Sequence, residues 1–530
     1  GKESGFIDGF NFDWAAKRVP KTAFESTDIV HWLALDVALK AMKDAGYSPE
    51  NINKENTGVI LGNTLTGEFT RTNAMRTRWP FVRKVLEKTA EAKGLVDSEM
   101  AEFINEVEEA YKSVFPAVTE DTLAGGLSNT IAGRICNKLD LNGGGYTIDG
   151  ACSSSLLALI NGARSLVSGE LDMAFVGGID ISLDTFELIG FAKTSALTSD
   201  QMSVYDKKAS GFIPGEGCGF VVLKRLEDAQ RDGDQIYAVV NGWGISSDGK
   251  GGITAPSVTG QAKAIETAYN MAPYSLNDCD FIEGHGTGTP LGDKTELNGL
   301  NLASKTTNDD NKIGLTSLKS VIGHTKAAAG IGAFIKTVIS VNRRIMPPTA
   351  GVQDPNSVFS NGPMFPLIDG IKKDPKQKMK AGVSAMGFGG INSHITLESF
   401  GRPNHKLETS IPEERLMISA EGSELIPFSA RSLDHLCEKI DDAIQQVKFI
   451  SHAEVSDFGH EKSRYIKNNE AVKAVIIAKT PTELQESLLK LKKLTQGGIA
   501  SGKTKQEGNV WLSYHAEEKK YGFLFPGQGS

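Results

Sequence analysis

The sequence predicts an α/β fold, in which helices cover mostly parallel sheets. Residues 145–181 have the pattern of a short strand, a tight turn, a helix and a buried strand, which together make a βαβ unit. A similar alternation returns at 236–300 and at 313–345. We therefore expect two similar α/β halves, although no sequence repeat is plain.

The first elements of the chain are a helix and a strand. Residues 29–46 carry apolar side chains at helical spacing, with Gly46 as the C-cap. Residues 57–64 predict a buried strand that runs into a polar loop. Residues 66–120 are rich in charged and helix-forming residues, so we expect two surface helices there that cover part of the core.

The composition changes near residue 400. A linker-like stretch is followed by alternating strand and helix patterns, so residues 406–522 predict a small separate α/β unit. The chain begins at Gly1 without a methionine and stops at Ser530 within a Gly/Pro-rich phrase. We expect it to be a piece of a longer protein.

The bulk composition argues against several classes of protein. The chain has 530 residues and a net charge of −8, so we expect no general affinity for nucleic acid. Its five cysteines form no CxxC pair, which predicts neither a disulfide framework nor a zinc site, and favours a reducing, cytoplasmic compartment. No apolar run reaches the roughly 20 residues that span a bilayer, so we expect no membrane span.

The first candidate catalytic residue is Cys152, on a predicted turn between a strand and a helix. Gly150 and Ala151 before it and three serines after it let the backbone bend sharply and leave the sulfur accessible. The helix N-terminus favours an anion, which predicts a lowered thiol pKa, and its free N–H groups suit an oxyanion. The alternative is a buried, inert cysteine.

Two histidines in glycine- and threonine-rich loops are the next candidates. His285 follows a predicted strand in EGHGTGTP, and His324 precedes a helix of small residues in SVIGHTKAAAG. Strand ends and helix starts are where α/β sheets present functional groups. Because a helix N-terminus disfavours imidazolium, we expect His324 to be a neutral hydrogen-bond donor. The alternative is that both histidines only cap backbone groups.

Two glycine-rich segments remain. Residues 387–394, GFGGINSH, surround Phe388 with glycines, which let a loop approach other backbone and move, although a tight core turn explains the same pattern. Residues 497–504 match the phosphate-loop pattern, but a helix precedes them and a strand follows. Since a phosphate loop needs the reverse order, we interpret this segment as a surface linker.

Together these motifs resemble the β-ketoacyl synthases of the thiolase superfamily. The nucleophile turn is DGACSSSLLAL, the histidine loops are EGHGTGTPLGD and SLKSVIGHTKAAAGI, and the gating loop is GFGGINSH. The resemblance covers residues 1–400 and implies a thiolase-like duplicated five-layer α/β/α/β/α fold. Ala333 stands where stand-alone bacterial synthases usually keep a glutamate, and the long segment 64–120 is similar to iterative synthases of the polyunsaturated-fatty-acid or enediyne type.

The resemblance also implies an order of domains. Residues 1–400 would form a ketosynthase domain that is truncated at its N-terminus, because the family's first strand is absent. Residues 401–522 would be the linker subdomain between a ketosynthase and an acyltransferase. Residues 523–530, with FPGQGS, would begin a truncated acyltransferase domain. Two departures from the family pattern, Gly150 and Pro214, remove no catalytic group.

A synthase of this family would run a two-step cycle. An acyl chain passes from the phosphopantetheine arm of an acyl carrier protein to the cysteine, and a malonyl thioester then loses carbon dioxide and condenses with it. The resemblance implies a homodimer, an adjacent acyltransferase domain in the same chain, and no metal or other cofactor bound by this domain. The roles that it implies are nucleophile for Cys152, enolate stabilisation for His285 and His324, ordering of the histidine loop for Lys319, an oxyanion hole from the N–H groups of Cys152 and Phe388, a gate for Phe388, and pantetheine binding for Thr287 and Thr289.

Three alternatives compete with the interpretation that the chain is a condensing ketosynthase. A catalytically silent or transfer-only ketosynthase-like domain typically lacks the cysteine or one histidine, and all three are present here. A Cys-dependent hydrolase needs a single general base, whereas two histidine loops fit enolate stabilisation better. A structural scaffold gives no reason for three loops of this kind. A further hypothesis is that residues 66–120 cover the acyl pocket or contribute to the dimer edge.

Overall fold

The chain divides into two compact units in this computed structural model. The first comprises residues 1–346, 355–367 and 373–405, and the second comprises residues 347–354, 368–372 and 406–530. The expected acyltransferase start at 523–530 and most of the expected linker stretch after residue 401 lie outside the described residues. The structure describes residues 5–94, 97–181, 183, 185–250, 252–253, 255–305, 312–401, 423–450, 452–467 and 469–515.

The first unit contains a four-stranded sheet in the order β2-β1-β3-β4. Its strands are β1 (Thr57–Gly62), β2 (Gly145–Ile148), β3 (Met173–Asp180) and β4 (Gly217–Lys224). Strand β1 pairs in parallel with β2 and β3, whereas β4 is antiparallel to β3. Every residue of β1 and β3 is buried, as expected for strands covered on both faces.

A six-stranded sheet in the order β5-β12-β11-β6-β7-β9 forms the other half of this unit. The strands β11, β6, β7 and β9 run parallel, but β5 and β12 are antiparallel to their neighbours. The sheets are therefore more mixed than the sequence predicted, because tight connections such as the β11–β12 hairpin bring antiparallel strands into them. The strands are β5 (Ala238–Ser247), β6 (Phe281–Glu283), β7 (Ile313–Thr316), β9 (Met364–Pro366), β11 (Lys380–Gly387) and β12 (Ile391–Ser399).

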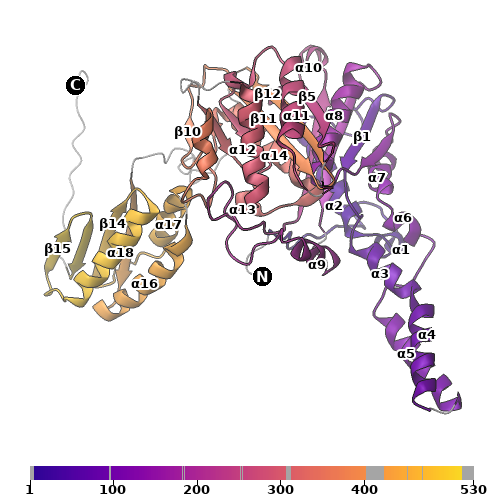
Figure 1. The fold of residues 1–530 in the computed structure, drawn as a ribbon, viewed down its shortest axis with the longest axis horizontal. Coiled ribbons are helices and arrows are strands. Elements are labelled where there is room, and N and C mark those ends of the chain that lie inside the picture. Colours follow the sequence, from indigo (N-terminus) through magenta and orange to yellow (C-terminus); the bar gives the residue numbers. More distant parts are fainter. Residues whose placement is uncertain are drawn as a thin grey trace. The chain divides into compact units, whose positions relative to one another are not determined.

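Helices and sheets alternate in five layers, as expected (Figure 1). Helices α2 (Ile29–Asp44) and α7 (Asn129–Leu139) cover the outer face of the first sheet. Helices α8 (Ser154–Val167) and α14 (Ala329–Arg343) lie between the two sheets and contact both. Helices α11 (Val258–Met271) and α12 (Pro290–Ser304) form the layer outside the second sheet. The largest apolar core lies in the middle layer, with residues of both sheets packed against α8 and α14.

The described chain also contains several short elements. They are α1 (Lys21–Glu25), α6 (Thr122–Gly126), α9 (Thr185–Lys193), α10 (Leu226–Asp232), α13 (Lys319–Ile322), β8 (Ile345–Met346) and β10 (Ile371–Lys372). Two predictions at the start of the chain are confirmed, because α2 forms the predicted helix and β1 is buried. The C-cap of α2 is Ala45, and the predicted Gly46 is the next residue, with a φ of +82°.

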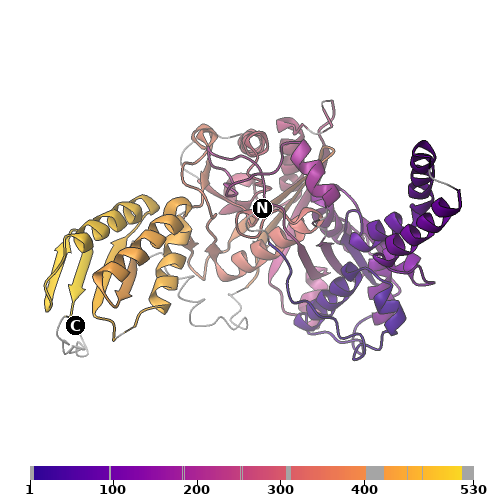
Figure 2. The same cartoon turned by 90° about the horizontal axis from the view of Figure 1, so that it is seen from below.

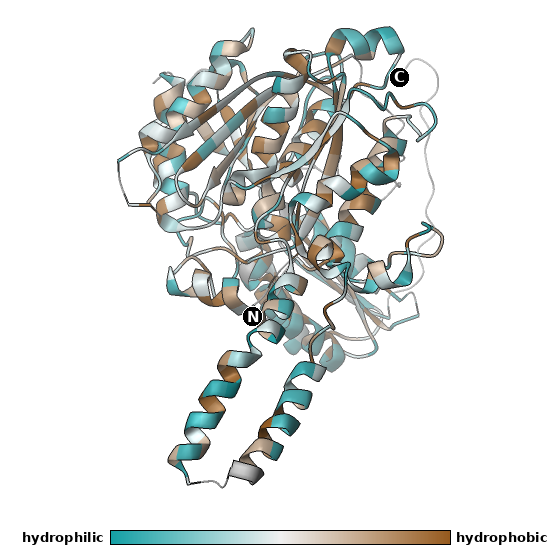
Figure 3. Cartoon of the chain, turned by 90° about the vertical axis from the view of Figure 1, so that its right-hand side faces the viewer, coloured by the Kyte–Doolittle hydropathy of each residue, from teal (hydrophilic) through white to brown (hydrophobic). Residues whose placement is uncertain are grey.

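Residues 66–120 differ from the prediction. They form three helices, α3 (Glu68–Thr77), α4 (Trp79–Ala92) and α5 (Asp97–Ser113), of which α4 and α5 pack against each other. Figure 3 shows these two as an antiparallel pair that extends away from the sheets. The ring of Trp79 lies 5.4 Å from that of Tyr111, at the base of the pair. The two helices therefore bury their own apolar faces and do not lie over the core, contrary to the prediction.

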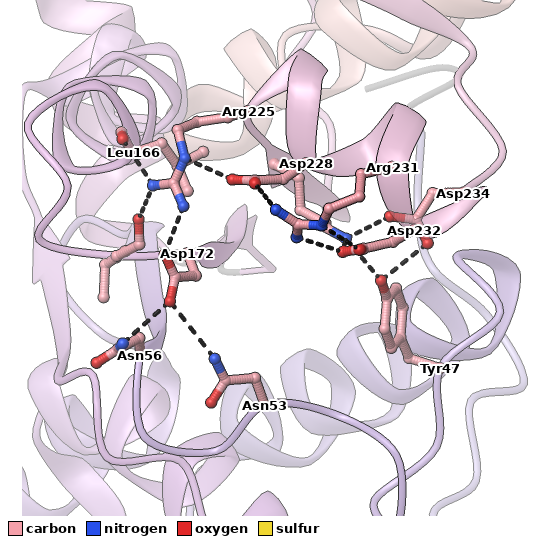
Figure 4. A network of polar contacts seen from close by, with 12 residues as sticks. Tyr47, Asn53, Asn56, Leu166, Asp172, Arg225, Asp228, Arg231, Asp232 and Asp234 are labelled. Carbon is pink, nitrogen blue, oxygen red and sulfur yellow. Dashed lines mark hydrogen bonds and ion pairs between the residues drawn. The ribbon is translucent and has the colours of Figure 1, made fainter.

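A network of charged groups fixes the end of β4 (Figure 4). Arg225 donates hydrogen bonds to the carbonyl oxygens of Leu166 (3.0 Å) and Leu171 (2.7 Å), and to Asp228 (2.6 Å). Lys224, the last residue of β4, forms an ion pair with Asp232 at 2.6 Å. Because such partly exposed pairs are screened by water, we expect this network to position α10 more than to stabilise the fold.

The second unit is a small α/β unit, with its sheet in the order β13-β14-β16-β15. All neighbouring strands are antiparallel. Helices α16 and α18 pack side by side, and α18 packs on β14 (Figures 1 and 2). The elements of the second unit are β13 (Glu424–Ala430), α16 (Leu433–Gln446), α17 (His452–Arg464), β14 (Val472–Ala478), α18 (Pro481–Gln496), β15 (Lys503–Glu507) and β16 (Val510–Tyr514). The segment 497–504 joins a helix to a strand, which is the reverse of a phosphate loop.

Candidate active site

Cys152 lies on a strained turn between β2 and α8. It is the middle residue of a 3₁₀ turn, Ala151–Ser153, that leads directly into the helix. Ala151 has a φ of +51°, a left-handed conformation that is uncommon for a residue with a side chain. The Asp149 carboxylate holds this conformation by accepting a hydrogen bond from the Ala151 N–H at 2.9 Å. We call residues 149–153 the nucleophile turn.

The tip of the β11–β12 hairpin lies against the nucleophile turn. A Cβ atom at Gly387 would come within 2.2 Å of the Gly150 carbonyl oxygen, so only glycine permits this approach. The contact brings the Phe388 N–H into hydrogen-bonding reach of the Cys152 thiol, and the Ser153 hydroxyl donates to the Ala385 carbonyl at 3.2 Å. The Phe388 side chain is 54% exposed. We call residues 387–390 the gate turn.

The electrostatics of Cys152 differ from the prediction. Burial raises the pKa of its thiol to about 11, while the charge of Lys319 and the Phe388 N–H act to lower it. The lowered pKa expected from the helix N-terminus is therefore not found, because removal of the sulfur from water outweighs the groups that favour thiolate. A resting thiol follows at neutral pH, and ionisation has to accompany the reaction.

The two predicted histidines lie next to each other. The ring centroids of His285 and His324 are 5.6 Å apart. His285 follows β6, and its Nδ1 accepts a hydrogen bond from the Met386 N–H at 3.3 Å. His324 follows α13, and its Nδ1 accepts from the Lys326 N–H at 3.2 Å. When Nδ1 is an acceptor, a neutral imidazole carries its proton on Nε2, so these bonds assign the tautomer of both rings.

Both histidines are neutral at physiological pH. Burial lowers the pKa of His285 and of His324 well below the usual value, and the charge of Lys319 lowers both further. The lowered pKa of His324 agrees with the prediction that this histidine is neutral at neutral pH. Its main cause is burial, which the sequence did not predict, with the cations Lys319 and Lys326 adding to it.

Lys319 interacts electrostatically with the cysteine and with both histidines. It is the first residue of α13 and is 4% exposed. Burial lowers its pKa, while the nearby carboxylates of Glu283 and Glu296 raise it. Its charge acts on Cys152 and on both rings, so a single buried cation stabilises thiolate and disfavours imidazolium.

Two buried carboxylates on α12 hold the His285 loop, and sequence analysis missed both. Glu296 accepts from the N–H groups of His285 (2.6 Å) and Gly286 (2.8 Å). Asp293 accepts from the N–H groups of Thr287 (3.1 Å) and Gly288 (3.0 Å). Their spacing of three residues places them on one face of α12, directly after a glycine-rich loop, and that pattern was the available signal.

The predicted threonines lie on the same loop. Thr287 is buried, and its hydroxyl lies 3.0 Å from that of Thr289. The structure thus groups all the predicted site residues on the nucleophile turn, the gate turn and the two histidine loops. Within the described part of the chain, no group of three or more metal-ligating side chains is found. Among the described helices, none combines the length and the hydrophobicity that a membrane-spanning segment requires.

Comparison with known families accounts for this arrangement. The model for the N-terminal domain of β-ketoacyl synthases matches residues 1–229, and the model for their C-terminal domain matches residues 237–353. The chain belongs to the β-ketoacyl synthase family. The prediction made from the four loops is thereby confirmed.

Similar proteins are parts of large synthases. The β-ketoacyl synthase chain is 32% identical over 470 residues to a polyunsaturated fatty acid synthase of Thraustochytrium, covering 86% of this chain and 16% of that protein. It is also 32% identical over 446 residues to polyketide synthase PksL of Bacillus subtilis, covering 82% of this chain and 9% of that protein. The chain thus spans less than a fifth of the length of these relatives.

A solved structure shares the fold. The ketosynthase from module 1 of the bacillaene synthase of Bacillus amyloliquefaciens matches with a TM-score of 0.61 and 26% identity. The match covers 96% of this chain and 82% of that one. The thiolase-like α/β fold predicted for this ketosynthase is therefore confirmed.

Proposed function

We propose that this ketosynthase catalyses decarboxylative Claisen condensation in a polyketide or polyunsaturated-fatty-acid synthase, with Cys152 as nucleophile. The observation that carries the proposal is the set of N–H donors on the loops that contact the nucleophile turn or the strand that leads to the gate turn. Phe388 directs its N–H at the sulfur, and His285 and His324 both keep an Nε2 proton for donation. This set suits two successive anions, a tetrahedral oxyanion and an enolate.

The first half-reaction is a thioester exchange. The sulfur of Cys152 attacks the carbonyl carbon of an acyl thioester on the phosphopantetheine of an acyl carrier protein. The N–H groups of Cys152 and Phe388 would bind the oxyanion, and Thr287 and Thr289 would bind the pantetheine arm. The thiol proton leaves with the pantetheine sulfur, so proton and charge balance, and Lys319 stabilises the thiolate as it forms.

The second half-reaction makes the carbon–carbon bond. A malonyl thioester loses carbon dioxide, and the electron pair of the broken bond moves onto the thioester oxygen as an enolate. The Nε2 protons of His285 and His324 would stabilise that oxygen. The enolate carbon then attacks the acyl-Cys152 carbonyl, which releases the thiolate and a β-ketoacyl thioester. The Phe388 side chain would act as the gate between the two steps.

The wider organisation is also a proposal. Residues 1–400 would act as the ketosynthase domain, 401–522 as the linker subdomain and 523–530 as the start of an acyltransferase domain in the same chain. The antiparallel α/β unit around β13 and β14 supports the linker assignment by its separate core. A homodimer, an acyl carrier protein as partner and a cytoplasmic location complete the proposal. The domain itself would bind no cofactor.

The test is intact-protein mass spectrometry. The wild-type chain and a Cys152→Ala variant are incubated with an acyl thioester and then with malonyl-loaded carrier protein. We expect an acyl adduct on the wild type only, followed by its discharge into a β-ketoacyl product. An adduct that is never discharged would point to the transfer-only alternative, and no adduct at all would exclude Cys152 as an accessible nucleophile.

A further inference from the structure

A second buried lysine lies beside the site, and none of the roles above uses it. Lys326 follows His324 by two residues and is 4% exposed. Its ammonium forms ion pairs with Asp180 (2.6 Å), the last residue of β3, and with Glu187 (2.8 Å) on α9. These two carboxylates are themselves almost completely buried. We call these three residues the lysine clamp.

The backbone of Lys326 is part of the site. Its φ of +48° is left-handed, which an L residue rarely adopts without support. In this conformation its N–H donates to Nδ1 of His324. The next N–H, of Ala327, donates to Asp180 at 3.3 Å, so one carboxylate holds both the side chain of Lys326 and the peptide that follows it.

The clamp also connects His324 to helix α9. Glu187 lies in the first turn of α9, and Phe191 one turn later packs edge-on against Phe212 at 5.2 Å. Phe212 in turn packs edge-on against the His324 ring at 5.0 Å. Helix α9 is thus linked to the His324 loop twice, by the ion pair of Glu187 with Lys326 and by the packing of Phe191 on Phe212, which contacts the His324 ring.

The charge states fit a clamp that is ionised near neutral pH. Burial raises the pKa of Asp180 to about 6, so it remains mostly ionised at pH 7.5. Burial lowers the pKa of Lys326, but the two carboxylates outweigh this and raise it overall. A buried ion group of this kind orders its surroundings, because removing one partner leaves an uncompensated charge.

We propose that Lys326 is a positioning residue for the condensation step: its ammonium, held by Asp180 and Glu187, fixes the backbone turn that keeps the His324 proton on Nε2. The inference rests on the proposed function, in which His324 stabilises the enolate. It assigns no contact with substrate to Lys326. Its consequence falls mainly on condensation, because the Cys152 acylation step uses the Phe388 N–H and not His324. The charges of Lys326 and Asp180 also act on the pKa of the Cys152 thiol, but in opposite directions.

The test separates the two half-reactions. In Lys326→Met, we expect acylation of Cys152 within about threefold of wild type, and condensation slower by roughly 10- to 100-fold, the range for residues that orient a catalytic group. The loss should lie in kcat, with KM for malonyl-loaded carrier protein little changed. Lys193→Met, which removes an exposed lysine from the same helix α9, is the matched control and should leave both steps unchanged.

A spectroscopic measurement reports the tautomer directly. In protein labelled with ¹⁵N-histidine, the His324 signals, assigned by their loss in His324→Gln, should show a protonated Nε2 in the wild type. In Lys326→Met, a share of the Nδ1-protonated form should appear. A merely structural lysine would leave the tautomer unchanged. The tautomer measurement needs no turnover. It therefore tests the inference even if the wild type forms no condensation product and the proposed function fails.

A milder variant covers the case in which Lys326→Met does not fold. Glu187→Gln keeps the lysine and Asp180, and we expect it to slow condensation less than Lys326→Met does, while acylation is retained. The proposal is overturned if folded variants condense at the wild-type rate, or if both half-reactions fall by the same factor. It is also overturned if the His324 tautomer is the same in all of them.

Discussion

The planes of the His285 and His324 rings meet at 86°, with their centroids 5.6 Å apart. Each ring accepts a backbone N–H at Nδ1, from Met386 and from Lys326. Two loops from different parts of the chain therefore present two equivalent donors, not a donor and a base. Such a pair suits an oxygen that becomes negative during the reaction, which is what decarboxylation of a malonyl thioester produces.

The first prediction concerns these two donors. Replacing either His285 or His324 with alanine should slow decarboxylation of a malonyl thioester by roughly 10²- to 10³-fold, the usual loss for one oxyanion donor. Acylation of Cys152 should continue in both variants. Carbon dioxide release and intact mass measure the two steps. His460→Ala, an exposed histidine on α17, is the control. A variant that loses acylation more than decarboxylation would contradict the assignment.

The second prediction concerns the buried histidines and stability. The pKa of His394 is lowered to about 3 by burial. The unfolded chain therefore binds a proton near pH 6 that the folded chain does not, so this residue's contribution to stability is present above about pH 6.5 and is lost as the pH falls. The pKa is also lowered at His31, His285 and His324, so these residues change the pH dependence of stability in the same direction.

The measurement is the melting temperature between pH 8 and pH 5. The melting temperature should fall with pH in the wild type and fall less steeply in His394→Phe. The reason is that His394 changes the free energy of unfolding by up to about 1.4 kcal/mol per pH unit. Buried carboxylates such as Asp293, whose pKa burial raises to about 7, act in the opposite direction but are common to both proteins. Parallel slopes in the two proteins would show that His394 titrates normally.

The third prediction concerns the thiol. Because burial raises the pKa of Cys152 to about 11, its alkylation by iodoacetamide should accelerate close to tenfold for each pH unit between 7 and 9. Lys319→Met removes the charge that favours thiolate, so it should raise the thiol pKa further and slow alkylation at every pH. Peptide mapping distinguishes Cys152 from the other cysteines. A rate that levels off below pH 8 would mean an activated thiolate at rest.

Sequence patterns predicted the elements whose causes are local. The apolar spacing of α2, the buried run of β1 and the small residues around Cys152 all follow from neighbouring residues. The end of β6 placed His285 correctly, and His324 lies shortly before α14, the helix of small residues that the sequence predicted after it. The site residues came from four separate segments, and their motifs sufficed to group them before any distance was known.

What the sequence did not predict depends on residues far apart in the chain. The raised pKa of Cys152 reflects burial by other segments, which no local pattern records. Lys326 pairs with Asp180, which lies far earlier in the chain, so its role was invisible beside the motif that contains it. Glu296 and Asp293 are a different case, because they lie only 11 and 6 residues from the N–H groups that they accept from, and their spacing on α12 was a local signal that the sequence analysis did not use.

The fourth prediction concerns the contact between the gate turn and the nucleophile turn. In Gly387→Ala, the added methyl group meets the Gly150 carbonyl oxygen at 2.2 Å, so the two turns must separate. The Phe388 N–H then moves away from the sulfur, and acylation of Cys152 should fall by roughly 10²-fold. Gly133→Ala, a helical glycine of α7 with nothing within 4 Å of its added Cβ, should be neutral or slightly stabilising. Equal acylation rates in both variants would refute a role for this contact.

The last prediction concerns the α4–α5 pair. Arg76 donates to the Phe115 carbonyl at 3.1 Å and the Tyr111 hydroxyl donates to the Met75 carbonyl at 2.9 Å, so the two ends of the pair lie close together. A short Gly/Ser link should therefore replace residues 81–109 without disturbing the Trp79–Tyr111 contact. The removed helices pack mainly on each other, and Phe81 at the outer face is 65% exposed.

We expect this shortened chain to melt within about 3 °C of the wild type, because little of the removed surface packs on the core. Acylation and condensation should also be retained. Two other results would each restore part of the hypothesis that residues 66–120 serve the acyl pocket or the dimer. A narrower or wider range of accepted acyl chains would mean that the pair covers the acyl pocket, and a smaller sedimentation coefficient than the mass change explains would mean that it contributes to a dimer edge.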